Sequence, residues 1–511
     1  MVEWRQVAVA RRLLASERGT IVRDWGGQVP VVLAYPNNYA VGMASLAVHG
    51  LYRWLNELPG IVCERAFSSL GRGSSEGGPL FTLESQRPVG EAAVLAFSIS
   101  FEMDYLNVVH MLYRAHVPLR AEERDEADPL VLLGGPAVSA NPEPLALLAD
   151  AIVIGEVEPL LERLGACLRE GWREGRQAFL RELARLPGVY VPLLHQGEGV
   201  QRQWLAELDA YPLSTSIIAP RAEFGDMYLI EISRGCIFGC RFCLTGYWYR
   251  PYRERSLEQI LALARKGLEQ CSKLGLVAAA VSTHSQIDEL TRRLRALGAG
   301  FSVSSLRVRP LSPILVQGLA ESGAHSITLA PEAGTERLRR FIGKGVGHGD
   351  ILRAVELAAK WRFRSLKLYF MFGLPTETEE DIEGLLALLK EVRARFSRQI
   401  VANLTPFVPK AHTPFERKAM AAREVLAARL RRLREGCRAL HVELRVEPIR
   451  AARMQGVLAR GDRRVGQALL RVRRPSLAHL QRALEEEGLT MEEYLREYAS
   501  DEPLPWDFLR G

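Results

Sequence analysis

Cysteine is scarce in this chain, with seven among 511 residues, and four of the seven stand far from any other. Usage this low excludes a disulfide-stabilised scaffold and favours a reducing compartment. No run of about 18 apolar residues occurs, which argues against a membrane-spanning helix. The first twenty residues lack the apolar centre of a secretion signal. The sequence therefore predicts a cytoplasmic protein.

Aromatic residues are also few, at 8% of the chain, and none is interleaved with the arginine-rich stretches near residues 430, 462 and 472. The net charge of +7 comes mostly from arginine. Basic clusters without aromatic neighbours are most simply solvated helix faces. An anionic partner stays open, but the pattern does not favour a nucleic acid.

Short apolar runs alternate with helical stretches in the first 200 residues, at 30–35, 93–100, 129–135 and 151–156. This alternation is typical of a parallel sheet with helices on both faces, in which ligands bind at the carboxyl ends of the strands. The length predicts several domains. We expect a doubly wound parallel sheet at 1–200, a linker at 201–225, a barrel at 226–415 and a mainly helical extension at 416–511.

The barrel is predicted from a second series of strands, each followed by a helix or a loop. Six strands are fewer than the eight of a complete barrel, so a partial (β/α)6 barrel is the natural closure. A further strand is possible at 441–449. The six predicted strands are 227–233, 276–282, 301–308, 326–331, 366–373 and 400–407.

Three of the seven cysteines, Cys236, Cys240 and Cys243, lie together in the spacing CxxxCxxC after the first barrel strand. Three thiolates bind a soft metal, but a structural zinc needs a fourth ligand, which would have to come from a distant residue such as His284. An iron–sulfur cubane held by three cysteines leaves one iron open for a substrate or a cofactor. Active sites of barrel enzymes lie at this end of the strands.

The cysteine segment, with Phe242 before the last cysteine, resembles the radical S-adenosylmethionine enzymes. The resemblance implies a [4Fe–4S] cluster on the three cysteines and S-adenosyl-L-methionine on its open iron. The reduced cluster would cleave this cofactor to methionine and a 5′-deoxyadenosyl radical. The resemblance also implies an external electron donor of the flavodoxin or ferredoxin type.

Later strand ends of the barrel match segments that bind S-adenosylmethionine in this family, notably LAPEAGTERLRRFIGK and LKLYFMFGLP. Lys367 and Tyr369 alternate with apolar residues and so share one face of their strand. His284 is a candidate for cofactor contact or proton transfer, with an ordinary loop histidine as the alternative. The candidate cofactor-binding residues are Phe242, Ser282, His284, Ser304, Glu332, Lys367 and Gly373.

The first 200 residues resemble the cobalamin-binding domain that precedes the radical domain in one subgroup, on the segments GGPAVSANPEPL and AIVIGEVEP. Gly134, Gly135 and Gly155 would let the backbone approach a bulky ligand closely. The Asp-x-His-x-x-Gly motif whose histidine ligates cobalt is missing, and we expect His49 and His110 to be packing or surface residues. Cobalamin therefore remains a possible cofactor.

Three reactions stay open at this stage. The first is cobalamin-dependent methylation of an unactivated carbon, and the second is a cobalamin-independent rearrangement, cyclisation or oxidation. The third, an RNA-modifying iron–sulfur protein such as a tRNA methylthiotransferase, would need three further cysteines near the N-terminus, where only Cys63 and Cys167 occur. The substrate, a small molecule or a peptide, is not named by the sequence.

Overall fold

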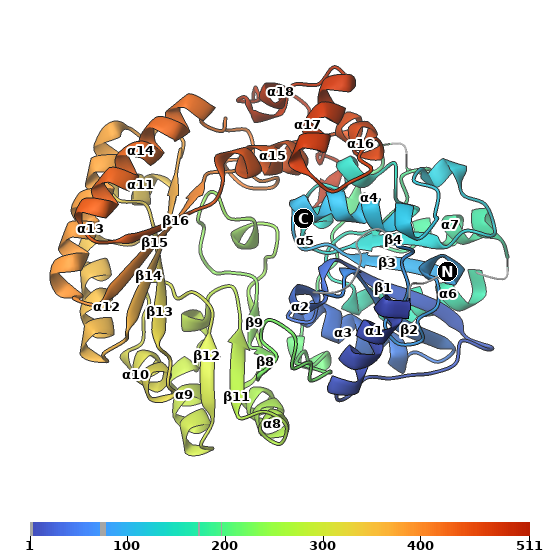
Figure 1. Cartoon of the computed structure of the whole chain (residues 1–511), viewed down its shortest axis with the longest axis horizontal. Coiled ribbons are helices and arrows are strands. Elements are labelled where there is room, and N and C mark those ends of the chain that lie inside the picture. Colours follow the sequence, from blue (N-terminus) through green and yellow to red (C-terminus); the bar gives the residue numbers. More distant parts are fainter. Residues whose placement is uncertain (1–3, 72–77, 172–173, 196) are drawn as a thin grey trace.

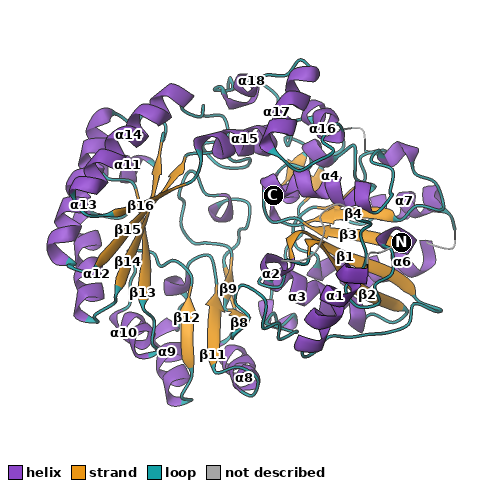
Figure 2. Ribbon diagram, in the orientation of Figure 1, coloured by secondary structure: helices purple, strands orange, loops and turns teal. Residues whose placement is uncertain are grey.

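Parallel strands and the helices between them form one sheet in the first part of the chain and a second, curved sheet in the middle (Figure 1, Figure 2). The computed structural model describes residues 4–71, 78–171, 174–195 and 197–511. Helices cover the sheets, and most of the strand side chains are therefore buried. The predicted α/β fold, a doubly wound sheet followed by a partial barrel, is confirmed.

The first sheet has the strand order β2-β1-β3-β4-β5-β6 and is parallel except for β6, which pairs antiparallel with β5. Its strands are β1 (Val29–Asn38), β2 (Ile61–Ser69), β3 (Val94–Ser98), β4 (Leu130–Gly134), β5 (Ala151–Val153) and β6 (Val189–Tyr190). The helices of this part are α1 (Trp4–Ser16), α2 (Tyr39–Gly42), α3 (Leu46–Glu57), α4 (Tyr105–Arg114), α5 (Pro136–Ala140), α6 (Leu161–Gly171) and α7 (Arg176–Ala184).

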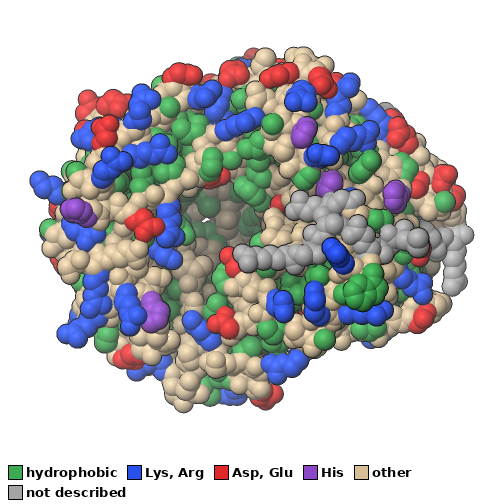
Figure 3. Space-filling view, viewed as in Figure 1, with side chains coloured by type: hydrophobic (Ala, Val, Ile, Leu, Met, Phe, Trp, Pro, Cys, Tyr) green, Lys and Arg blue, Asp and Glu red, His purple; other side chains and the backbone are tan. Residues whose placement is uncertain are grey.

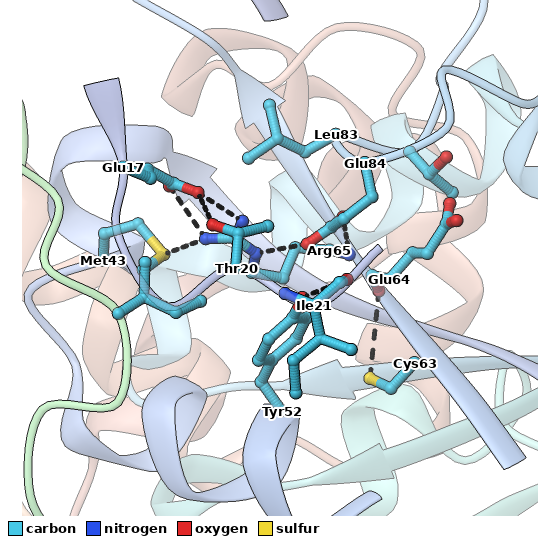
Figure 4. A network of polar contacts seen from close by, with 12 residues as sticks. Glu17, Thr20, Ile21, Met43, Tyr52, Cys63, Glu64, Arg65, Leu83 and Glu84 are labelled. Atoms are coloured by element: carbon cyan, nitrogen blue, oxygen red, sulfur yellow. Dashed lines mark hydrogen bonds and ion pairs between the residues drawn. The ribbon is translucent and has the colours of Figure 1, made fainter. Parts of the chain in front are cut away.

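Strand β2 was not predicted, because its sequence IVCERAFSS carries two charged residues in the middle. Both charges are nevertheless buried. Arg65 donates to Glu17, which follows α1, and to Glu84, at 2.7 Å in each case (Figure 4). Glu64 accepts a hydrogen bond from the Ser85 hydroxyl at 2.6 Å. The charges of the strand are therefore balanced in the core by residues of other segments, which a pattern of apolar residues cannot reveal.

The second sheet contains all six expected strands, and β16 adds a seventh. Strands β12-β11-β8 and β13-β14-β15-β16 pair in parallel, and a bridge between Leu306 and Leu329 joins the two groups. The prediction of a strand at 276–282 was too late, since the chain turns after Val277. The strands are β8 (Met227–Glu231), β11 (Lys273–Val277), β12 (Gly300–Val303), β13 (Ser326–Glu332), β14 (Ser365–Phe372), β15 (Gln399–Pro406) and β16 (Glu443–Val446).

Helices cover the outer face of the curved sheet, and the C-terminal helices pack against both parts (Figure 1). The barrel helices are α8 (Leu257–Leu268), α9 (Ile287–Ala296), α10 (Pro313–Glu321), α11 (Glu336–Phe341), α12 (His348–Lys360), α13 (Glu379–Arg395) and α14 (Arg423–Ala439). The remaining elements are α15 (Ile449–Arg460), α16 (Arg463–Leu470), α17 (Leu477–Glu486), α18 (Met491–Leu495) and the short strands β7 (Val200–Gln201), β9 (Ser233–Arg234), β10 (Arg253–Glu254) and β17 (Leu509–Arg510).

The carboxyl ends of the two sheets meet. Glu102, after β3, pairs with Lys410, after β15, at 2.5 Å. Gln455 of α15 donates to the other oxygen of Glu102 at 3.0 Å. Because ligands bind at the carboxyl ends of parallel strands in both kinds of fold, this arrangement directs two ligand-binding edges at one another.

Candidate functional site

The cysteine segment is a loop that starts at the carboxyl end of β8 and is tied to its surroundings by backbone contacts. The Arg241 amide donates to the Ile342 carbonyl at 2.8 Å, and the Cys243 amide donates to the Cys240 carbonyl at 2.9 Å. Gly235 has a φ of +78°, and a Cβ there would lie 2.3 Å from the Tyr249 carbonyl. This glycine therefore allows the tight turn that leads into the cysteines.

The three cysteines Cys236, Cys240 and Cys243 are free thiols in this loop, and Cys240 is buried. Burial raises the pKa of the Cys243 thiol, so a bound cation would be needed to hold it as a thiolate. Among the described residues no three His, Cys, Asp or Glu side chains are grouped to hold a metal ion. In a cubane each cysteine binds a different iron, so convergence on one ion is not required of the three sulfurs.

Arg307, which sequence reasoning missed, reaches the cysteine loop from the segment after β12. Its Nη1 lies 3.4 Å from the Sγ of Cys240, and its guanidinium covers the Phe238 ring at 3.5 Å from the centroid. The arginine is 8% exposed. A lone arginine in SVSSLRV gives no signal in the sequence, because the partner sulfur lies 67 positions away.

Glu332 and Lys344, from the segment that matches the family, form an ion pair of 2.9 Å at the end of β13. Glu332 has a φ of +72°, an uncommon backbone conformation for a residue with a side chain. The Lys344 carbonyl also accepts from Arg307. The predicted glutamate is therefore engaged by a lysine that adjoins the cysteine loop.

The inner face of the curved sheet carries polar side chains. Along β14, Lys367 and Tyr369 alternate with fully buried leucine and phenylalanine, as predicted, and Tyr369 is 41% exposed. Tyr369 is in register with Asn403 of β15, whose buried Nδ2 has no hydrogen-bond partner among the described residues. Lys367 forms no ion pair within that part of the chain, although its charge acts on the Glu443 carboxylate of β16 and helps to lower the pKa of that group. Unpaired donors on this face suit a ligand that brings acceptors.

The candidates from the second and third strands lie in different surroundings. Ser282, in a 3₁₀ turn after β11, has a buried hydroxyl without a partner in the described structure. His284 is buried, and its two ring nitrogens contact the Arg255 carbonyl at 3.1 Å and the Gln286 amide at 3.2 Å. Ser304 is exposed after β12. The exposed Ser304 can meet a ligand as it stands, whereas the Ser282 hydroxyl is buried and His284 would first have to release a backbone group.

Gly373 and Phe242 have structural neighbours of their own. Gly373 has a φ of +73°, and its amide donates to Glu377 at 2.6 Å. Burial raises the pKa of Glu377 to about 7, and Arg429 of α14 contacts the same carboxylate at 2.8 Å. Phe242 packs against an apolar cluster that includes Leu374. The Gly-Leu-Pro segment that starts at Gly373 is thus held in place by Glu377, which is itself bound by Arg429 of α14.

A largely apolar cavity of about 340 Å³ lies between the first sheet and the helices α3 and α6, and Arg234, Tyr249 and Val277 of the barrel also line it. Gly134, Gly135 and Gly155 all line it, as expected for a ligand site at this edge. The reason for two of the glycines differs from the prediction. A Cβ at Gly135 would lie 2.5 Å from the Ile99 carbonyl, and one at Gly155 2.1 Å from the Gln203 carbonyl, so close chain packing requires them. At Gly134 a Cβ would meet nothing closer than 3.9 Å.

A buried charge network, formed by Glu156, Glu158, Glu231, Arg234 and Arg253, separates this cavity from the cysteine loop. Arg234, two residues before Cys236, contacts Glu156 at 2.8 Å, Glu158 at 2.9 Å and Glu231 at 3.0 Å. Arg253 contacts Glu156 at 2.8 Å. The two glutamates after β5 therefore hold the base of the cysteine loop against the first sheet.

The surface between the two parts is hollowed, and hydrophobic side chains are visible in the wall of the hollow (Figure 3). Phe101 after β3, Ile237 in the cysteine loop and Val277 at the end of β11 are large apolar residues with 37–52% exposure. All three follow carboxyl ends of strands. Exposed apolar side chains gathered at such edges are typical of a ligand-binding space.

Sequence comparisons match both parts of the chain. The profile described as "Radical SAM proteins, N-terminal" matches residues 47–192, and "Radical SAM superfamily" matches residues 230–389. Uncharacterized protein MJ0966 of Methanocaldococcus jannaschii is 30% identical over 444 residues, which is 86% of this chain and 90% of that protein. A Pyrococcus horikoshii protein named as an uncharacterized methyltransferase is 25% identical over 312 residues, 58% of this chain and 65% of that protein.

Two solved structures share the fold. TsrM from Kitasatospora setae, a radical S-adenosylmethionine methyltransferase with cobalamin and a [4Fe–4S] cluster bound, has a TM-score of 0.51 at 16% identity over 76% of this chain and 77% of its own. The cobalamin-dependent S-adenosylmethionine radical enzyme OxsB has a TM-score of 0.52 at 14% identity over 71% and 52%. Likeness at such identities concerns the fold alone.

Among the described residues, no helix combines the length and the apolar character needed to cross a bilayer. Two family profiles match most of the first sheet and most of the second in the expected order, and the 30% identical relative aligns along most of the chain. The chain therefore belongs to the radical S-adenosylmethionine superfamily of enzymes.

Proposed function

We propose that this enzyme binds cobalamin beside its radical centre and methylates an unactivated carbon. Membership of the superfamily implies a [4Fe–4S] cluster and S-adenosylmethionine as cofactors. The observation that carries the cobalamin proposal is the apolar cavity of about 340 Å³ at the first sheet, whose lining includes Gly134, Gly135 and Arg234, two residues before Cys236. Cobalamin-binding TsrM and OxsB have the same fold, which supports this reading.

In this proposal Cys236, Cys240 and Cys243 would hold the cluster as thiolates. Reduced by an external donor of the flavodoxin or ferredoxin type, the cluster would supply the electron for the cleavage of S-adenosylmethionine to methionine and a 5′-deoxyadenosyl radical. The orphaned Nδ2 of Asn403 and the neighbouring ammonium of Lys367 would bind acceptor groups of the cofactor inside the barrel. Buried donors of this kind fit a polar ligand.

The cavity in the first sheet suits the apolar part of a large cofactor tail, because α3 and α6 line it with leucines and exclude water. His49 would not ligate cobalt. Its Nε2 contacts the Met43 carbonyl at 3.0 Å, and its Nδ1 accepts from the Ser216 amide of the linker at 3.3 Å, so both nitrogens are engaged by the backbone. We therefore infer a cobalamin that is held without this histidine.

Anaerobic reconstitution with iron, sulfide and hydroxocobalamin tests the proposal. Iron content and the visible corrinoid spectrum report on the two cofactors, and 5′-deoxyadenosine and S-adenosylhomocysteine report on the reaction. Ala47→Phe provides one matched variant, because Ala47 of α3 is exposed to the cavity and a phenylalanine would fill it. Cys240→Ala provides the other.

Ala47→Phe should lose the corrinoid and keep its iron, whereas Cys240→Ala should lose iron and keep the corrinoid. Wild-type protein that forms 5′-deoxyadenosine but binds no corrinoid would overturn the methylation proposal. It would leave the cobalamin-independent rearrangement, cyclisation or oxidation. The absence of any iron-dependent 5′-deoxyadenosine would remove the proposed role of the three cysteines.

A further inference from the structure

Arg307 is a buried guanidinium that meets a sulfur and no carboxylate. Its Nη1 lies 3.4 Å from the Sγ of Cys240, and its residue exposure is 8%. No Asp or Glu of the described chain forms an ion pair with it, although arginines close by, such as Arg234, contact three glutamates. A buried charge without a counter-ion is costly, so the site calls for negative charge at the cysteine.

The guanidinium is fixed in place by its other donors. The Nε donates to the Arg309 carbonyl at 3.0 Å, and Nη2 donates to the Lys344 carbonyl. The planar group lies over the Phe238 ring at 3.5 Å from its centroid. The arginine thus bridges the segment after β12, the loop after α11 and the cysteine loop. The Nη1 donor therefore points at the sulfur without freedom to turn to solvent.

The neighbouring cation does not take this role. The Lys344 ammonium is paired with Glu332 at 2.9 Å, so its charge is compensated locally. Arg250, at the far side of the loop, is exposed, and its guanidinium lies near the Phe238 carbonyl and the Tyr247 ring. Among the described residues, Arg307 is the cation that donates a hydrogen bond to a cysteine sulfur of this loop.

We propose that Arg307 is a positioning residue that donates a charge-assisted hydrogen bond to the Cys240 thiolate and thereby stabilises the reduced cluster. The inference rests on the proposed role of the three cysteines. Reduction adds one electron from the external donor, with no bond broken and no proton taken up, so the cluster becomes more negative by one charge. A fixed cation and donor stabilise the more negative state, which raises the midpoint potential.

An EPR-monitored redox titration of reconstituted protein, with titanium(III) citrate as reductant, measures this effect without turnover. Arg307→Gln keeps a polar side chain and removes the charge. We expect its reduced-to-oxidised ratio at a given potential to fall at least tenfold, which for a one-electron couple is a midpoint lower by 59 mV. Arg307→Lys keeps the charge without the planar fork and should shift the midpoint less.

Arg250→Gln is the matched control, because it removes a solvated charge from the same loop without touching a sulfur; its midpoint should equal that of the wild type. Arg307→Gln with wild-type iron content and an unchanged midpoint would overturn the inference, as would an equal shift in Arg250→Gln. Where the glutamine variant loses iron, the lysine variant takes its place in the same comparison. Wild-type protein without iron or an EPR signal would instead refute the cysteine site itself.

Discussion

The buried triad of Arg65, Glu17 and Glu84 offers a quantitative test of how the first sheet is held together (Figure 4). All three side chains are fully buried, with both ion pairs at 2.7 Å. Burial raises the pKa of Glu84; at Glu17 burial acts in the same direction, but Arg65 outweighs it and lowers the pKa. Arg65→Met leaves two carboxylates without their cation, a loss of about 3–5 kcal/mol.

Thermal unfolding at pH 7, followed by circular dichroism, should show this loss as a melting temperature lower by roughly 3–5 °C, at about 1 °C per kcal/mol for a chain of 511 residues. Arg185→Met is the control, since Arg185 is 72% exposed and its pair with Glu182 contributes less than about 1 kcal/mol. Adding Glu17→Gln and Glu84→Gln to Arg65→Met removes the stranded charges and should recover much of the loss. A cost below about 1 kcal/mol, or no recovery in the triple variant, would refute the reasoning.

Three further predictions concern single residues. Burial lowers the pKa of His49 from 6.5 to about 4, so between these pH values only the unfolded chain takes up a proton at this residue. As the pH falls from 7 to 4, the free energy of unfolding of the wild type, measured in urea, should fall by up to about 3 kcal/mol more than that of His49→Gln (2.5 units at 1.36). Parallel pH profiles of the two proteins would contradict this prediction. Gly373→Ala, at a φ of +73° and with Leu426 2.4 Å from the new Cβ, should cost about 1–3 kcal/mol in the same assay, and an unchanged midpoint would contradict it. Asn403→Ala should keep the wild-type iron content and weaken S-adenosylmethionine binding about tenfold in equilibrium dialysis. Gln399→Ala, at the exposed start of the same strand, should bind as the wild type does. Equal affinity in the two variants would contradict a contact between Asn403 and the cofactor.

The sequence predicted most of the fold because buried parallel strands are nearly continuous apolar runs. Strands that are not continuous apolar runs were missed or misplaced. Strand β2 hides Glu64 and Arg65 among apolar residues, and their partners Ser85 and Glu17 lie 21 and 48 positions away. The start of β11 was missed because Lys273 and Gly275 look like a helix end, although they pair with β8.

The candidate site was predictable as far as local motifs reach. The cysteine spacing and the glycines at the sheet edge are visible in the chain, and the structure places them at facing strand ends. The contact of Arg307 with Cys240 and the orphaned amide of Asn403 were not visible, because both depend on how distant segments of the chain pack together. The close packing that requires Gly135 and Gly155 was not visible either, since the carbonyls that exclude a side chain come from other segments.

The charges that lock the cysteine loop to the first sheet bear on how the nascent polypeptide matures. Glu156 and Glu158 are synthesised before Arg234 and Arg253. The two glutamates therefore remain without these ion-pair partners until the barrel begins to form. Recombinant fragments that separate the acidic from the basic members would each expose unmatched charge beside apolar surface, and we expect them to aggregate. Attempts to dissect this enzyme should therefore keep both modules on one polypeptide.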